Sequence, residues 1–219
     1  TDVTITKTWQ KPAGEATPDS IIVTLKQDGT AMTEYTDFEI QKSDCTIDEN
    51  GVWSYTFKNL PDSKPDGGTY KYTVEEKTMD GWNTSYGDDS LSIVNTASGT
   101  TSVVVAKFWT LPEGMSADDQ TVEVTLTRDG QKLTGDEYTK TITGNGMVKF
   151  ENLPKYNENG QLYQYGAEEA SGNYQQAKPA TSDGYTITFY NTVAVEKTSI
   201  SGVTVSYTHL RAHETRRHL

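Results

Sequence analysis

The sequence predicts an all-β chain that forms two tandem antiparallel β-sandwiches. Three features support this prediction: short segments of alternating polar and apolar residues, Asp-Gly and Asn-Gly steps between them, and a pattern that occurs twice. Thr, Tyr and Val are frequent, as is typical of strands, and no segment has helical periodicity. A length of 219 residues is enough for two domains of ordinary size.

The repeat consists of five short sequences that return in the second half in the same order. These are ITKTW (5–9) and VAKFW (105–109), SIIVTLKQDG (20–29) and TVEVTLTRDG (121–130), YTFKNLP (55–61) and VKFENLP (148–154), YTVEE (72–76) and YGAEE (165–169), and SIVNT (92–96) and TFYNT (188–192). We therefore expect one sandwich at 1–97 and a second at 98–193, joined through the polar segment 95–102.

The strands of the first copy are predicted from their alternation and from the turn sequences KQDG and DENG between them. They are 3–9, 20–27, 36–41, 52–58, 69–77 and 90–95. Spacing of this kind is typical of a sandwich.

The end of the chain differs from the two copies. Residues 194–205 resemble the opening of a third repeat, so we expect the chain to be a fragment of an array. Residues 206–219 contain all three histidines and three of the four arginines. This segment is either a basic, metal-binding tail or foreign sequence similar to translated adapter read-through. We interpret it as non-native and exclude it from the fold.

Composition excludes several classes of function. A net charge of −12 argues against a nucleic-acid partner, because phosphate binding requires basic patches. No apolar run reaches membrane-spanning length, and the single Cys45 excludes an internal disulfide. No Ser-His-Asp or paired-carboxylate arrangement is present, so we expect no enzyme, no cofactor and no metal site.

An inward-facing lysine marks the first strand, VTITKTW at 3–9. Side chains alternate strictly along a strand, so Lys7 shares the apolar face of Val3, Ile5 and Trp9. The same reasoning places five further polar side chains on apolar faces: Glu76, Asn95, Lys107, Glu169 and Asn191. The neighbouring carboxylates Glu75 and Glu168 are expected to point outward.

Each copy thus places one lysine, one glutamate and one asparagine in its predicted core. For a single inward lysine, a buried ion pair or an edge position with a snorkelling stem is the simpler interpretation. The asparagine adds a third functional group, a carboxamide, to the amine and the carboxyl group. Desolvation makes an amine nucleophilic, a buried carboxyl group can stay protonated and transfer protons, and a carboxamide offers an electrophilic carbon with ammonia as leaving group. Together these groups could form an intramolecular isopeptide bond.

Both units resemble the Cna protein B-type repeat domains of Gram-positive surface adhesins and pilins. The resemblance covers residues 1 to about 192 and rests on the KxW opening, the NLP loop, the YxVxE strand and the terminal NT. It implies an immunoglobulin-like or prealbumin-like sandwich with a lysine–asparagine isopeptide bond. The implied bonds are Lys7–Asn95, promoted by Glu76, and Lys107–Asn191, promoted by Glu169. In YGAEE the smaller Gly166 and Ala167 depart from the pattern.

The resemblance implies a structural stalk segment of an extracellular, cell-wall-anchored protein. Its partners would be neighbouring repeats and, through a distal domain, the host extracellular matrix. Two alternatives remain open. One is a module that binds carbohydrate or host protein through exposed aromatic residues, namely Trp53, Trp82, Tyr86 and Tyr156. The other is a spacer of a secreted hydrolase.

Overall fold

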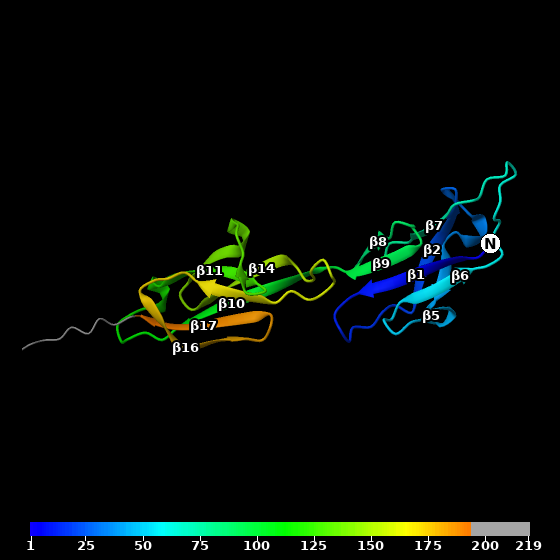
Figure 1. Cartoon of the computed structure of the whole chain (residues 1–219). Helices are drawn as coiled ribbons and strands as arrows, with labels where there is room; N and C mark the ends of the chain where they lie inside the picture. The colour runs from blue at the N-terminus through cyan, green and yellow to red at the C-terminus, as the bar shows by residue number, and fades with distance from the viewer. Residues whose placement is uncertain (194–219) are drawn as a thin grey trace, which may run out of the picture.

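A computed structural model describes residues 1–193, which form two β-sandwiches arranged end to end (Figure 1). The predicted third-repeat start (194–205) and non-native tail (206–219) lie outside the described residues. Four short 3-10 turns accompany the strands, and no helix in the described part is long and apolar enough to cross a membrane. The all-β prediction is confirmed.

The N-terminal sandwich contains nine strands. They are β1 (Val3–Gln10), β2 (Ser20–Gln27), β3 (Thr30–Ala31), β4 (Phe38–Gln41), β5 (Thr46–Ile47), β6 (Trp53–Phe57), β7 (Tyr72–Glu76), β8 (Trp82–Tyr86) and β9 (Ser92–Ala97). One sheet has the order β5-β6-β1-β9-β8, and in the other β2 lies between β3 and β4 and also pairs with β7.

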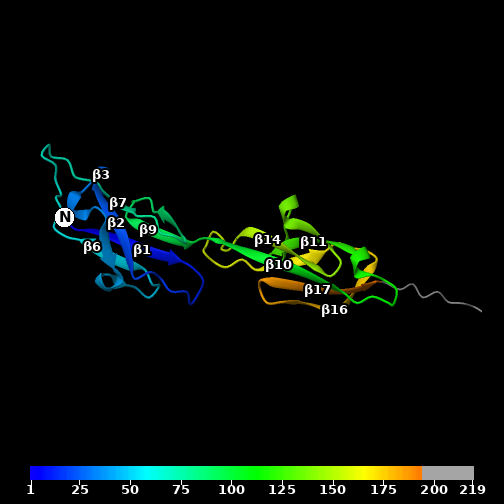
Figure 2. The same ribbon diagram turned by 180° about the vertical axis from the view of Figure 1, so that it is seen from behind.

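The C-terminal sandwich repeats this plan (Figure 2). Its strands are β10 (Thr100–Trp109), β11 (Thr121–Arg128), β12 (Gln131–Lys132), β13 (Thr139–Thr143), β14 (Gly146–Pro154), β15 (Tyr165–Glu169), β16 (Tyr174–Ser182) and β17 (Thr186–Val193). The sheet β14-β10-β17-β16 faces a second sheet in which β11 pairs with β12, β13 and β15.

Alternation along the strands produces two separate apolar cores. In β1, Val3 and Ile5 are buried whereas Thr4 is exposed, as the period of two requires. The first core extends from Val3 to Ile93 and the second from Val103 to Phe189. Each sandwich therefore buries its own apolar faces.

Backbone conformation explains where the observed strands differ from the predicted ones. Asp37 has φ of 49° and Ser90 has φ of 54°, so β4 and β9 begin after these residues and not at 36 and 90. The predicted KQDG hairpin is present, with positive φ at both Asp28 and Gly29, as a type I′ turn requires.

One feature of the topology was not predicted. Most strand pairs are antiparallel, but the first and last strands of each sandwich, β1 with β9 and β10 with β17, pair in parallel. Sequence alternation does not contain this information, because both pairings have the same period. The parallel pairing places the lysine strand directly beside the asparagine strand.

Candidate functional site

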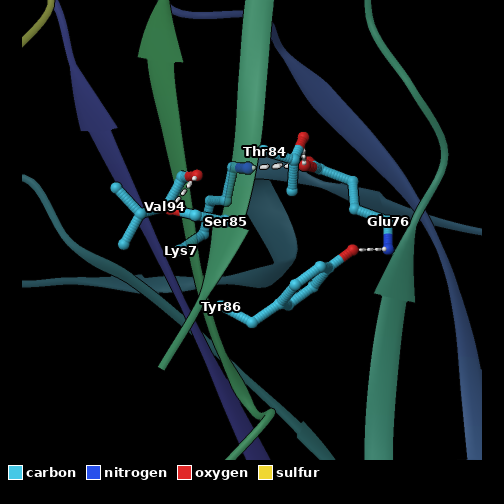
Figure 3. Close-up of polar contacts among 6 residues, drawn as sticks. All are labelled: Lys7, Glu76, Thr84, Ser85, Tyr86 and Val94. Atoms are coloured by element: carbon cyan, nitrogen blue, oxygen red, sulfur yellow. Dashed lines mark hydrogen bonds and ion pairs between the residues drawn. The ribbon is translucent and has the colours of Figure 1, made fainter. Parts of the chain in front are cut away.

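A buried ion pair joins the two sheets of the N-terminal sandwich. Lys7 on β1 is 2% exposed, and Glu76 on β7 of the opposite sheet is 5% exposed. The Lys7 Nζ donates to both carboxylate oxygens of Glu76, at 2.7 Å to Oε1 and 2.9 Å to Oε2 (Figure 3). The inward-facing lysine predicted from VTITKTW therefore reaches across the core to a carboxylate.

Asn95 lies on the strand next to Lys7 and faces the same core. It is the register partner of Trp9 in the parallel β1–β9 pair and is fully buried. Among the described residues, neither its Nδ2 nor its Oδ1 has a hydrogen-bond partner. A buried polar atom without a partner costs about 1–3 kcal/mol, so this carboxamide is held in place by the fold at an energetic cost.

Strand β8, which the sequence analysis missed, completes the surroundings of Glu76. The Thr84 hydroxyl donates to Glu76 Oε2 at 3.0 Å, and the Glu76 backbone N–H donates to the Tyr86 hydroxyl at 2.8 Å (Figure 3). Trp82, Thr84 and Tyr86 alternate in WNTSY, which is the signal that could have identified this strand.

The C-terminal sandwich contains the equivalent cluster with a different hydrogen-bond pattern. Lys107 on β10 is fully buried and its Nζ donates to Glu169 Oε1 at 2.5 Å. The Asn191 Nδ2 donates to the other oxygen, Oε2, at 2.8 Å, and its Oδ1 has no partner among the described residues. Glu169 therefore bridges the amine and the carboxamide.

The strand beside each asparagine accounts for part of this difference. Thr84 is the register partner of Asn95, and Gln176 is the register partner of Asn191. Thr84 donates to the nearby glutamate, whereas Glu169 receives its second hydrogen bond from Asn191 itself. The Glu169 side chain is 13% exposed, so the second cluster is slightly more open to solvent.

A local steric contact explains why YGAEE has glycine at position 166, where the first copy has threonine. It is the register partner of Thr127, and a Cβ at position 166 would lie 2.5 Å from Thr127 Oγ1. A real Cβ does not approach an oxygen so closely, so the glycine accommodates the buried Thr127 side chain.

Burial changes the acid–base properties of both amines. Desolvation lowers the pKa of Lys7 to about 8, against the opposing effect of its hydrogen bond and charge interaction with Glu76. Burial likewise lowers the pKa of Lys107, opposed by Glu169. Each Nζ lies 4.5 Å from the centre of a tryptophan ring, Trp9 or Trp109, so the KxW spacing covers the amine with an aromatic ring.

The carboxylates predicted to point outward and the aromatic residues predicted to be exposed are not members of the two Lys-Glu-Asn clusters. Glu75 and Glu168 are exposed, away from the two clusters. The expectation of an exposed Trp53 is wrong, because this residue is 2% exposed in the core. Trp82 is half-buried and packs edge-on against Trp9, with ring centres 4.7 Å apart.

Tyr86 is 40% exposed, whereas Tyr156 is half-buried on a loop of the other sandwich. The four aromatic residues do not form one exposed face, because their positions are set by packing within each sandwich.

Comparison with known families agrees with this repeated architecture. A model of the Cna protein B-type domain matches the chain twice, at residues 3–96 and 103–192. The chain belongs to this family. Both matched segments contain a complete Lys-Glu-Asn cluster.

One curated relative of the chain is an adhesin. A collagen adhesin of Staphylococcus aureus is 30% identical over 166 residues, which cover 72% of this chain and 13% of that protein. The chain thus spans a small part of that relative's length.

Among solved structures, a single B repeat unit of the collagen-binding surface protein of Staphylococcus aureus is 21% identical, with 89% of this chain and 99% of that chain covered and a TM-score of 0.37. Two B repeat units of the same protein are 28% identical, with 88% and 50% covered and a TM-score of 0.36. The major pilin from Streptococcus pyogenes is 15% identical, with 88% and 98% covered and a TM-score of 0.34.

Proposed function

We propose that the chain is a stalk segment of an extracellular, cell-wall-anchored adhesin or pilin, and that each repeat is cross-linked by a self-formed Lys–Asn isopeptide bond. The observation that carries the proposal is the convergence of an amine, a carboxyl group and a carboxamide between the two sheets, once in each sandwich. The family membership of both repeats supports the stalk function.

The proposed reaction begins with proton transfer within the buried pair. Moving one proton from the Lys7 ammonium to the Glu76 carboxylate gives a neutral amine and a carboxylic acid. A dry pocket favours this neutral pair over two separated charges. The Nζ lone pair then becomes available for attack.

The neutral amine attacks Cγ of Asn95, and the Nζ–Cγ bond forms as the Cγ–Nδ2 bond breaks. Glu76 polarises the amide and transfers a proton from Nζ to the departing Nδ2, which leaves as ammonia. Lys107, Glu169 and Asn191 have the corresponding roles. Orientation in a folded core contributes roughly 7–11 kcal/mol to such a reaction. Since each site reacts only once, this is maturation and not turnover.

The cross-links would determine how the chain bears tension. Each bond joins the first strand of a sandwich to the last, so force passes from β1 to β9 and from β10 to β17 without loading the residues between them. Such a link also resists reduction, as suits an extracellular protein whose only cysteine is Cys45. We propose further that the boundary between residues 97 and 98 separates two folding units, with neighbouring repeats as partners and host matrix bound through a distal domain.

Intact-mass measurement of the full chain tests the proposal. The wild type should weigh two ammonia molecules less than its sequence mass. Glu76→Ala and Glu169→Ala should each lose one ammonia, and the double variant none. Tandem mass spectrometry of tryptic peptides should identify the Lys7–Asn95 and Lys107–Asn191 branched pairs. A wild-type chain at its full sequence mass would reject the cross-links.

A further inference from the structure

The two sandwiches meet at a contact between a loop and a strand end. The loop that begins at the last residue of β14, residues 154–163, reaches toward the end of β1 (Figures 1 and 2). Gln161 Nε2 donates to the Lys11 carbonyl at 2.9 Å. A Cβ built on Gly160 would lie 2.1 Å from the Gln10 carbonyl oxygen, so only glycine permits this approach. We call residues 154–163 the docking loop and Gln10–Lys11 the strand end.

The docking loop has a counterpart in the N-terminal sandwich, at residues 61–70. The same two backbone hydrogen bonds close both loops: Lys64 N to Gly68 O (2.6 Å) and Gly67 N to Lys64 O (3.0 Å), and Asn157 N to Gln161 O (2.8 Å) and Gly160 N to Asn157 O (2.9 Å). Both central glycines have positive φ, 89° at Gly67 and 71° at Gly160. The two loops therefore share one backbone conformation.

The strand end is also repeated. Thr110–Leu111 follows Trp109 as Gln10–Lys11 follows Trp9. A turn of the same form comes next in both copies, closed by Glu15 N to Pro12 O at 3.3 Å and by Met115 N to Pro112 O at 3.2 Å. Each sandwich thus presents a loop at one end and a strand end at the other.

Among residues 1–193, only one of the two pairs is in contact. The C-terminal docking loop contacts the N-terminal strand end, whereas a Cβ on Gly67 would meet nothing within 4 Å. A contact between two different surfaces leaves one surface of each kind free, and in an elongated chain with its repeats end to end it extends into an open array. We propose that loop 61–70 and the strand end Thr110–Leu111 are docking surfaces for further Cna B-type repeats, arranged head to tail. This inference deepens the proposed stalk function.

The load path gives this contact a defined role. Gln10 and Lys11 lie between Lys7 and Asn95, and residues 160–161 lie between Lys107 and Asn191. The docking loop and the strand end that it contacts are therefore outside the segments that would carry tension. The contact orients consecutive repeats and can open and close without breaking the covalent path.

The contact within the chain has a matched pair of variants. Gly160→Val places a side chain against the Gln10 carbonyl oxygen, whereas Gly67→Val places the same side chain, also at a positive φ, in open space. Backbone strain is thus common to both. The readout is the rotational correlation time of each sandwich from ¹⁵N relaxation of the full chain. Wild type and Gly67→Val should tumble as one body and Gly160→Val as two. A single correlation time in Gly160→Val would overturn the proposal.

The unused surfaces are tested between molecules. A ¹⁵N-labelled chain is titrated with unlabelled chain up to about 2 mM, the range of effective concentrations within an array. Salt of about 0.5 M shortens the Debye length to roughly 4 Å and so screens the repulsion between acidic copies. Chemical shifts should change in residues 61–70 and 110–113 of the wild type and stay constant in Gly67→Val. No change in the wild type, or the same change in Gly67→Val, would overturn the proposal.

The intact mass separates this inference from the proposed cross-linking. Gly160→Val and Gly67→Val should both lose two ammonia molecules, because neither substitution touches a Lys-Glu-Asn cluster. If docking fails while the masses are as expected, the head-to-tail surfaces are rejected and the cross-links stand. If both variants have their full sequence mass while docking is observed, the cross-links are rejected and the head-to-tail surfaces stand.

Discussion

Trp9 and Asn95 are register partners in the parallel pair β1–β9, and Trp109 and Asn191 are register partners in β10–β17. Because residues two apart share a face of a strand, this register places each asparagine on the face that also contains the lysine two residues before the tryptophan. The KxW sequence therefore does two things: it directs the amine inward, and it places an aromatic ring 4.5 Å from the Nζ in both copies.

Loss of the Lys7–Asn95 cross-link should lower the free energy of unfolding of the N-terminal sandwich, because the unfolded chain gains conformational entropy when this loop is open. The proposed bond closes a loop with 87 residues between positions 7 and 95, so Glu76→Gln should reduce the free energy of unfolding of the N-terminal sandwich by about 4–5 kcal/mol. Guanidinium denaturation followed by the fluorescence of Trp53 and Trp82 measures this change. The control is Glu75→Gln, which removes an exposed carboxylate paired with Lys26 and should cost less than about 1 kcal/mol. Equal effects of the two substitutions would contradict the prediction.

The free energy of unfolding should depend on pH in a variant whose Lys7 amine has not reacted. In Asn95→Ala, Lys7 keeps its amine, with a folded-state pKa of about 8 against 10.5 in the unfolded chain. Between these values the unfolded chain binds more protons, so the free energy of unfolding should rise from pH 8 to pH 10.5, by up to roughly 3 kcal/mol. The measurement is urea denaturation at a series of pH values. Lys7→Met/Asn95→Ala should lack this rise, and a fall with pH in Asn95→Ala would refute the lowered pKa.

Thr84 should act as a positioning residue for Glu76. Thr84→Val keeps the side-chain shape but removes the hydroxyl that donates to Glu76 Oε2 at 3.0 Å. We expect formation of the Lys7–Asn95 bond to slow by about 10–100-fold, because misorientation of a reacting group has costs of this order. A time course of branched-peptide formation after refolding measures the rate. The Lys107–Asn191 bond in the same molecule is the internal control, and slowing of both bonds alike would argue for a general folding defect.

The cross-links should prevent extension of the chain under force. In single-molecule pulling, the wild type should show no unfolding step from the residues between each lysine and its asparagine. Glu76→Ala should release the 87 residues between positions 7 and 95, which gives about 300 Å of added contour length. Glu169→Ala should release the 83 residues between positions 107 and 191, which gives about 290 Å of added contour length. A wild-type trace with either step would exclude the corresponding cross-link.

Much of the fold could be predicted from local sequence alone. Alternation in VTITKTW predicted the burial of Lys7, and alternation in SIVNT predicted the burial of Asn95. The Asp-Gly hairpin at 28–29 followed from the positive φ that both positions require. Burial of Trp53 was missed because an aromatic residue next to a turn gives no local sign of the sheet that will cover it.

The sequence by itself determined that the lysine, glutamate and asparagine of each cluster face inward, because side-chain alternation is a local property of an extended backbone. It also determined that the chain has two similar domains, because five short sequences recur in the same order in the second half. Only the tertiary structure decided that β1 lies parallel to β9, that Thr84 from an unpredicted strand contacts Glu76, and that Glu169 alone bridges to its asparagine. These relationships depend on contacts between residues far apart in the chain, and such contacts are chosen by packing of the whole sandwich.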